Sequence, residues 1–276
     1  MPFFIATDLG YFEQAGVLVE GTALESSNQL VDAVVSGNLD IAVEVSAVPV
    51  LSVEAQQPGR IKIFAVSAIT KEQPFDSLVV PSKSSIRTLK DLPGSRIGVF
   101  PGSTATALLR HFLDSRGVDT SAITFQPIPP QLQLQALANG SVDVLHAYEP
   151  TTAIALSRPG FVRLHGSVYA EQIEPNPQGV AIVSTRFLQE HPEAARKAIA
   201  ALTSACAFME VNDIEARGIL ERAMDLPRDV ATSTVLLYMR PAKDTDSVKL
   251  QSYVDLLRQI SELPKQVSAR ELLLQE

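Results

Sequence analysis

The chain has 276 residues, of which 46% are hydrophobic and 20% are charged, and its formal net charge is −8. These proportions are typical of a folded protein with one large or two modest domains. The acidic balance argues against a nucleic-acid partner, because phosphate binding requires a basic face. No apolar run approaches the length of a membrane span, so we expect a chain that does not span a membrane.

Signatures of metal-binding and catalytic proteins are missing from the sequence. Cys206 is the only cysteine, so the chain can form no internal disulfide and no cysteine-rich metal site. The histidines, His111, His146, His165 and His191, never recur at a metal-binding spacing. We therefore predict no catalytic residues, no metal and no cofactor. Cys206 lies on the apolar stripe of a predicted helix, which favours a buried core thiol over a catalytic nucleophile.

The first predicted element lacks its usual neighbour. Apolar residues recur at helical spacing from Phe3 to Phe12, Gly16 lies where a helix would end, and residues 17–20 are predicted to form a strand. In an alternating α/β protein such a helix normally follows a strand. Here only Met1 precedes it.

Residues 31–46 and 134–149 share one pattern: a helix, a glycine, a polar residue, an apolar residue, Asp and a strand. At a constant offset the equivalent pairs are Ala33 and Ala136, Gly37 and Gly140, Leu39 and Val142, Asp40 and Asp143, and Ser46 and Glu149. The glycine tolerates the left-handed conformation that ends a helix. The apolar strand is typical of a sheet covered by helices. The alternative is that any two helix–strand units look alike.

A second pairing at almost the same offset favours a true repeat. Residues 102–125, a predicted helix and strand, align with residues 1–20, and the two helix-ending glycines coincide. A predicted strand at residues 96–100 precedes the second copy, whereas its counterpart in the first copy would lie before residue 1. We therefore expect the first lobe to lack its first strand. Either that strand and an export signal are encoded upstream of Met1, or another segment or chain fills the gap.

The remaining pattern predicts two lobes. Further strands are predicted at residues 61–67, 77–81 and 180–183, and helices from Pro192, at 212–224 and at 246–261. We assign residues 1–78 and 180–276 to lobe 1 and residues 79–179 to lobe 2, with crossings near 77–82 and 174–182. Each lobe should hold a mixed, mainly parallel sheet flanked by helices. Two crossings predict a hinge, with the strand ends opening onto a cleft between the lobes.

The opening PFFIATDLGYFEQAG resembles the P-x-x-x-A…G-x-F…G opening of the nitrate/sulfonate/taurine-type solute-binding proteins of ABC importers. This group also includes binders of thiamine-precursor pyrimidines. The resemblance continues through SGNLDIAV, FDSLVVPSKSSIRTLKDLPGSRIGVFPGST, ANGSVDVLHAYEP and STRFLQEHPEAARKAIAAL. It implies a two-lobed, type II periplasmic-binding fold, a small-molecule ligand, a permease partner and a periplasmic or extracytoplasmic location at the transporter. We expect a monomer. Family members have a strand before the opening segment, where this sequence departs from the pattern.

Gly102, Ser103 and Thr104 form the first candidate site. They follow a predicted strand and begin a helix, whose free N–H groups and dipole favour an anionic or carbonyl oxygen. The alternative is simple N-capping of the helix by Ser103. The family places ligand contacts at this loop, which favours the functional interpretation.

The other candidates lie at equivalent strand ends and at the first helix. Tyr148 and Glu149 end one strand, and Glu149 is predicted either to pair with a ligand amine or to stabilise a helix start. Ser46 and Ser67 end two first-lobe strands and are either ligand contacts or turn residues. Of Phe3 and Phe4, one is expected in the core and the other beside the ligand. An oxygen-binding helix end with a carboxylate suggests an aminoalkyl sulfonate or an aminopyrimidine.

Solute binding for an ABC importer is the leading hypothesis. One alternative is an enzyme on the same fold, like the fungal pyrimidine synthases of this family. Those enzymes rely on a cysteine-rich motif, which a chain with Cys206 alone lacks. Another is a ligand-sensing module that serves a receptor.

Overall fold

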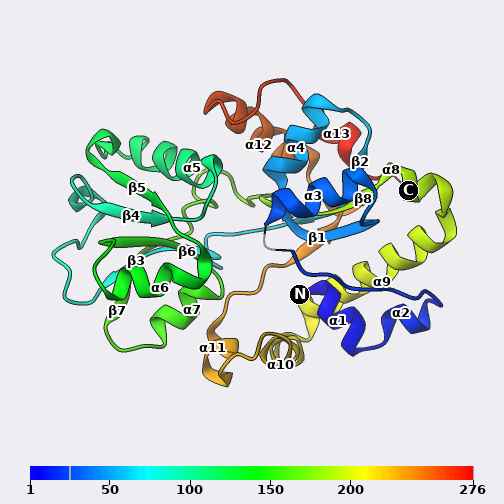
Figure 1. Cartoon of the computed structure of the whole chain (residues 1–276), viewed down its shortest axis with the longest axis horizontal. Coiled ribbons are helices and arrows are strands. Elements are labelled where there is room, and N and C mark those ends of the chain that lie inside the picture. Colours follow the sequence, from blue (N-terminus) through cyan, green and yellow to red (C-terminus); the bar gives the residue numbers. More distant parts are fainter. Residues whose placement is uncertain (25, 276) are drawn as a thin grey trace. The chain divides into compact units, whose positions relative to one another are not determined.

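The computed structural model describes residues 1–24 and 26–275, and the chain divides into two compact units (Figure 1). The first unit comprises Met1–Ala68, Asn176–Leu226 and Leu237–Glu276, and the second comprises Ile69–Pro175 and Pro227–Leu236. The expected boundaries differ from this division in three places: residues 69–78 and 227–236 belong to the second unit, and residues 176–179 belong to the first. Strand β3 (Asp76–Pro81) lies wholly in the second unit, because it pairs with strands there. Helix α11 (Arg228–Ser233) also belongs to the second unit, because it contacts α7 (Thr151–Leu156).

In the described part of the first unit, one sheet has the order β1-β8-β2-β9. Its strands are β1 (Ile41–Ser46), β2 (Ile61–Ser67), β8 (Gly179–Ser184) and β9 (Met239–Pro241). Its helices are α1 (Pro2–Asp8), α2 (Tyr11–Gln14), α3 (Ser27–Ser36), α4 (Ala47–Gln56), α8 (Thr185–Glu190), α9 (Pro192–Val211), α10 (Asp213–Met224), the 3-10 turn η3 (Ala242–Asp244), α12 (Ser247–Gln259) and α13 (Ala269–Leu272). Every residue of β8 is buried, so this strand forms the centre of the first core.

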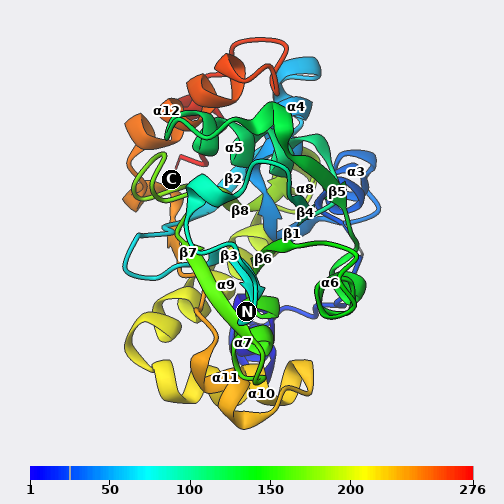
Figure 2. The same ribbon diagram turned by 90° about the vertical axis from the view of Figure 1, so that its left-hand side faces the viewer.

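The described part of the second unit has one sheet with the order β5-β4-β6-β3-β7. Besides β3, its strands are β4 (Arg96–Val99), β5 (Thr124–Pro127), β6 (Val144–Tyr148) and β7 (Phe161–Gly166). Its other helices are η1 (Leu89–Asp91), α5 (Ser103–Asp114), η2 (Thr120–Ala122) and α6 (Pro130–Ala138). Helix α5 covers one side of this sheet, whereas α6 and α7 lie on the other (Figures 1 and 2). The second unit therefore has an α/β layer structure of its own.

The predicted repeat is confirmed at its glycines. Gly37 and Gly140, which follow α3 and α6, have φ of 83° and 74°. Gly16 and Gly117, which follow α2 and α5, have φ of 68° and 72°. Glycine adopts these angles without the steric cost that other residues meet, so each pair ends its helix in the same way.

Strand direction corrects one expectation. The direct pairings of β8 with β1 and β2, and of β2 with β9, are all antiparallel, so the first sheet is not mainly parallel. In the second sheet β4 pairs in parallel with β5 and β6, but β3 is antiparallel to β6 and β7. The cause is that β8 lies between β1 and β2, which are parallel to each other, and β3 likewise lies between β6 and β7. Both inserted strands come from distant parts of the chain and run in the opposite direction to their neighbours.

The N-terminal segment corrects two further expectations. The predicted opening helix is divided into α1 and α2 at Gly10, which has φ of 67°. Residues 17–20 were predicted as a strand, but they have no strand structure. They belong to a coil of residues 17–24 that joins α2 to the segment before α3, and residues 18–24 are exposed (Figure 1). A strand needs a neighbouring strand for its backbone hydrogen bonds, and this segment has none among the described residues.

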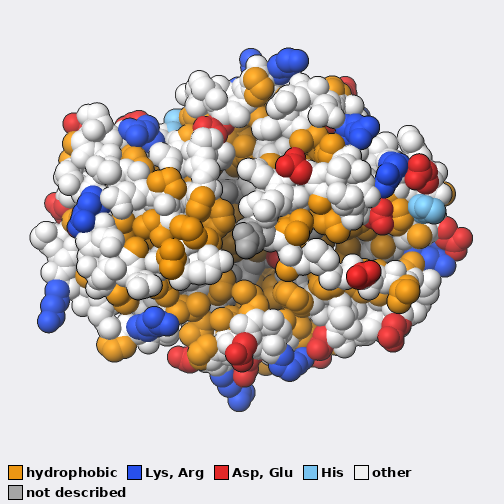
Figure 3. All heavy atoms as spheres, in the orientation of Figure 1, with side chains coloured by type: hydrophobic (Ala, Val, Ile, Leu, Met, Phe, Trp, Pro, Cys, Tyr) orange, Lys and Arg blue, Asp and Glu red, His pale blue; other side chains and the backbone are white. Residues whose placement is uncertain are grey.

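Basic side chains are dispersed over the surface in view. On the face drawn in Figure 3, Lys and Arg lie in small, separate groups rather than in one continuous area. Within the described residues, no helix combines the length and the apolar character needed to cross a membrane.

Candidate functional site

The N-terminus of α5 is the first part of the candidate site. The helix begins at Ser103, and its N-cap residue is Gly102, which has φ of 119° and no side chain to cap the helix. Ser103 is therefore not the N-cap that one sequence interpretation proposed. Gly102 and Ser103 are exposed and Thr104 is half-buried. Backbone N–H groups of a helix start and the positive end of its dipole favour an anion at this position.

Aromatic rings surround Tyr148 at the end of β6. The Phe75 ring is stacked on the Tyr148 ring with centroids 6.2 Å apart and an interplanar angle of 11°. The centroid of the Phe100 ring lies 5.6 Å from that of Tyr148, and Phe100 immediately follows β4, the strand that leads into α5. Because β4 and β6 are neighbours, the structure brings Tyr148 close to the loop that precedes Ser103. We call Phe75, Phe100 and Tyr148 the aromatic wall; all three rings are half-buried.

A buried, hydrogen-bonded pair of polar residues lies next to Tyr148 of the aromatic wall. His146 and Asp76, both 0% exposed, form a 3.0 Å hydrogen bond between Nε2 and Oδ2. The His146 ring also meets the rings of Tyr148 and Tyr169 edge to face, at 5.3 and 5.4 Å. The hydroxyl groups of Tyr148 and Tyr169 are hydrogen-bonded to each other. These contacts fix the orientation of the Tyr148 ring, since both its face and its hydroxyl have partners.

Glu149 makes the contact that the helix-start alternative predicts. Its Oε2 accepts a 3.2 Å hydrogen bond from the backbone N–H of Ala153, in the first turn of α7. A carboxylate at this position stabilises the helix N-terminus. Pairing of Glu149 with a ligand amine stays a prediction.

The first-unit serines lie on either side of Gly179 and have structural partners. Ser46 pairs with Gly179 in the ladder between β1 and β8, and its side chain caps α4 by accepting from the N–H of Val48 at 3.5 Å. Ser67 is 4% exposed, and its Oγ accepts a 2.8 Å hydrogen bond from the N–H of Gly179. These contacts give both serines structural partners, and contact of either serine with a ligand stays a prediction.

Phe3 and Phe4 lie in the N-terminal helix of the first unit. The Phe3 ring packs against Phe4 and Phe12, with centroids 6.0 Å apart in both pairs, and it covers Gly21. Phe3 is half-buried and Phe4 is 39% exposed, so neither ring is fully in the core. Contact of either ring with a ligand stays a prediction.

Sequence reasoning missed most of the aromatic wall. The sequence pattern indicated Phe3, Phe4 and Tyr148 as candidate aromatic contacts, whereas Phe75 and Phe100 flank Tyr148. Phe100 could have been found, because it immediately precedes the PGST loop. Phe75 gives no local signal, since it reaches Tyr148 only through the antiparallel pairing of β3 with β6.

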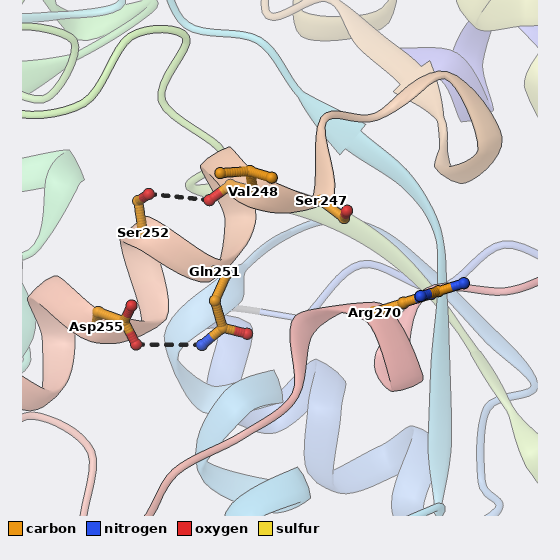
Figure 4. Close-up of a pocket in the computed structure, with 6 residues that line it drawn as sticks. All are labelled: Ser247, Val248, Gln251, Ser252, Asp255 and Arg270. Atoms are coloured by element: carbon orange, nitrogen blue, oxygen red, sulfur yellow. Dashed lines mark hydrogen bonds between the residues drawn. The ribbon is translucent and has the colours of Figure 1, made fainter.

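A surface hollow on α12 and α13 is a weaker candidate. Figure 4 shows the side chains of Gln251 and Asp255 pointing toward each other, with Arg270 contributed by α13. Gln251 donates to Asp255 at 3.1 Å and accepts from the N–H of Ala269 at 3.0 Å. The polar groups thus join two helices of the first unit, which indicates a structural role.

Cys206 lies in the core as predicted. It is 3% exposed, and burial raises the pKa of its thiol to about 12. At neutral pH the thiol is protonated, and a protonated thiol is a poor nucleophile.

The profile of the family described as NMT1/THI5 like matches residues 1–216. The chain belongs to this family. Among curated relatives, this chain is 24% identical over 238 residues to a protein of Bacillus subtilis (strain 168) that is named as an aliphatic sulfonates-binding protein. That match covers 85% of this chain and 70% of the relative. A binding protein of Brucella abortus (strain 2308) is 23% identical over 75% of this chain and 62% of its own length.

Solved structures show the same fold as this NMT1/THI5-like chain. The periplasmic aliphatic sulphonate binding protein SsuA from Escherichia coli matches with a TM-score of 0.80 and 18% identity, over 99% of this chain and 88% of SsuA. SsuA from Xanthomonas axonopodis pv. citri, bound to MOPS, matches with a TM-score of 0.80 and 21% identity, over 99% of this chain and 94% of that SsuA chain. The desulfurization enzyme DszB, in complex with biphenyl-2-sulfinic acid, matches with a TM-score of 0.73 and 16% identity, over 99% of this chain and 92% of the DszB chain. The type II periplasmic-binding fold is therefore confirmed, on a scaffold that binding proteins and an enzyme share.

Proposed function

We propose that the protein is the extracytoplasmic solute-binding subunit of an ABC importer and that it captures a small organic sulfonate. The observation that carries this proposal is the N-terminus of α5, which begins after Gly102 and lies beside the aromatic wall. Names of relatives and structural neighbours support it, because several are sulfonate-binding proteins. The protein acts as a monomer that delivers its ligand to a membrane permease.

The two parts of the site suit the two parts of a sulfonate. A sulfonate is ionised throughout the physiological pH range and presents three oxygens that accept hydrogen bonds. The start of α5 offers N–H donors and a positive dipole end, so it binds such a group without a basic side chain. The aromatic wall offers half-buried ring surface to the organic part of the ligand.

An amine on the ligand is the finer part of the proposal. Glu149 follows Tyr148 of the aromatic wall directly, and this supports a role in which its carboxylate pairs with the amine of an aminoalkyl sulfonate or an aminopyrimidine. The bond to Ala153 uses Oε2 of Glu149. The proposal also includes hinge closure on the ligand, because the chain passes between its two units more than once.

Calorimetric titration tests the ligand class. Ethanesulfonate, hexanesulfonate, taurine and an aminopyrimidine are titrated separately into the protein, with ethylammonium as the control for charge. We expect the sulfonates to bind and ethylammonium not to bind, with hexanesulfonate tighter than ethanesulfonate because its chain contacts the rings. Binding of the aminopyrimidine alone would reject the sulfonate proposal, and binding of none would reject this ligand range altogether.

Glu149→Gln separates the amine from the sulfonate. The amide still accepts the hydrogen bond from Ala153 but has no charge. If Glu149 pairs with the amine, the substitution weakens taurine by about 1–3 kcal/mol and leaves ethanesulfonate unchanged. If the wild type and Glu149→Gln bind taurine with equal affinity, Glu149 serves only to stabilise the helix start. Small-angle scattering with saturating ligand should show compaction, and an unchanged profile would argue against closure.

A further inference from the structure

The buried pair of Asp76 and His146 has no part in the ligand contacts proposed so far. Asp76 begins β3 and lies opposite Tyr148 in the ladder with β6. Because a carboxylate accepts hydrogen bonds, Nε2 of His146 donates the 3.0 Å bond to Asp76. Nδ1 of His146 is buried as well and has no hydrogen-bond partner among the described residues. Apolar residues often replace a buried polar pair without loss of stability, so stability alone does not account for this pair.

The pair reaches the Tyr148 ring by two routes. In the direct route, the His146 and Tyr148 rings meet with their centroids 5.3 Å apart and an interplanar angle of 73°. The indirect route passes through Tyr169, which is 1% exposed. Oδ1 of Asp76 accepts a 3.4 Å hydrogen bond from the backbone N–H of Tyr169, and the hydroxyl of Tyr169 is hydrogen-bonded to that of Tyr148. Buried residues therefore restrain both the ring and the hydroxyl of Tyr148.

The orientation of Tyr148 matters for what the aromatic wall can recognise. The Tyr148 and Phe75 rings are within 11° of parallel, so their faces point in nearly the same direction, and both rings are partly exposed. An aromatic group binds other rings in preferred stacked or edge-to-face arrangements, so its affinity depends on how those rings are oriented. Contact with an alkyl chain depends mainly on the area that is buried. A fixed Tyr148 ring therefore favours a flat aryl group over an alkyl chain of similar size.

We propose that His146, oriented by Asp76, is a positioning residue that holds the Tyr148 ring in one orientation and thereby makes the site selective for an arylsulfonate. This inference rests on the proposed function, because it takes the sulfonate to bind at the start of α5 and the aryl group to lie against the aromatic wall. His146 is 0% exposed, so it acts on the ligand only through Tyr148.

Calorimetric titration with benzenesulfonate and hexanesulfonate tests the selectivity, because the two ligands have the same number of carbon atoms and the same charged group. We expect the wild type to bind benzenesulfonate about three- to ten-fold more tightly than hexanesulfonate. In His146→Gln the amide still donates to Asp76, but the ring against Tyr148 is gone. This variant should lose most of the preference for benzenesulfonate and keep its affinity for ethanesulfonate. Tighter binding of hexanesulfonate by the wild type would overturn the proposal.

A second variant and a matched control complete the titration. Tyr169→Phe removes only the hydroxyl that is bonded to Tyr148, so it should also reduce the preference for benzenesulfonate, and it decides the test if His146→Gln does not fold. The control is His165→Gln in β7. His165 bonds to Glu171 at 2.8 Å, and its ring lies 5.3 Å from that of Phe112. This control should keep the wild-type preference, and an equal loss in His165→Gln would overturn the proposal.

Ring flipping of Tyr148 separates this inference from the proposed function. Nuclear magnetic resonance of ¹³C-labelled tyrosine measures the flip rate in the protein without ligand. We expect flips at least about ten-fold faster in His146→Gln and Tyr169→Phe than in the wild type or the control. If the wild type binds none of these sulfonates, the proposed function fails, and the flip rates still decide whether His146 positions Tyr148. Sulfonate binding with unchanged flip rates and an unchanged preference would keep the proposed function and overturn the role of His146.

Discussion

The same helix–strand repeat occurs in both units, but its equivalent strands have different neighbours. In the second unit β6 has a neighbour on each side, and the strand beside it, β4, leads into the N-terminus of α5. In the first unit β1 has a neighbour on one side, and α1 begins with no strand before it among the described residues. The difference shows that equivalent strands of one repeat can have different neighbours, because β1 lies at the edge of its sheet among the described residues whereas β6 lies inside its sheet. In the second unit a strand leads directly into a helix whose N-cap is Gly102, and this helix start is where we propose that the anion binds.

Removing apolar volume from β4 should have the largest effect. Ile97 is 0% exposed, so Ile97→Ala should lower the free energy of unfolding by about 2–5 kcal/mol. Leu18, in the coil that corresponds to the β5 region, is fully exposed, and Leu18→Ala should change it by less than about 0.5 kcal/mol. Denaturant unfolding of both variants measures the two values. Similar losses would contradict the exposure of Leu18 and the burial of Ile97 that the structure shows.

Substitution of the two equivalent aspartates should change the free energy of unfolding by smaller and unequal amounts. Asp143→Ala removes the acceptor of the Arg96 backbone N–H and should cost about 1 kcal/mol. Asp40→Ala removes no bond within the described residues and should be neutral. Thermal melts of the two variants check this prediction, and a loss of stability from Asp40→Ala equal to that from Asp143→Ala would show that Asp40 already has a partner.

Acidification should reduce the contribution of Asp143. Hydrogen bonds from Arg96 hold the pKa of the Asp143 carboxyl below its ordinary value. The folded state thus favours the ionised form, so the stabilisation is complete above the unfolded pKa of about 3.9 and is lost as the pH falls through the lower folded value. The difference in stability between the wild type and Asp143→Ala should therefore shrink below about pH 4. A difference that stays constant from pH 6 to pH 3 would assign it to packing instead of charge.

Sequence reasoning predicted the local elements better than their neighbours. The pattern that ends at Gly37 and Gly140 is decided by residues close in sequence, so the paired helix ends were predictable. Residues 17–20 have the same kind of strand pattern, but a strand also needs a partner, which the pattern does not contain. The prediction of mainly parallel sheets failed because β3 and β8 are inserted from distant parts of the chain.

The same limit applies to the candidate site. The loop at Gly102 and Ser103 was predictable, because a strand, a glycine and a helix follow one another in the sequence. The aromatic wall was not, because Phe75 and Tyr148 are far apart in the chain and meet only through strand pairing. The support of Tyr148 by Tyr169 likewise depends on tertiary structure.

Nuclear magnetic resonance titration tests most directly whether the second unit holds the anion. The ¹⁵N-labelled protein is titrated with ethanesulfonate and, separately, with ethylammonium, and the backbone amide signals are followed. Our account predicts that the amides of Ser103 and Thr104 shift with ethanesulfonate, saturate with the calorimetric affinity and do not respond to ethylammonium. Saturable binding of ethanesulfonate that leaves both amides unchanged would contradict it.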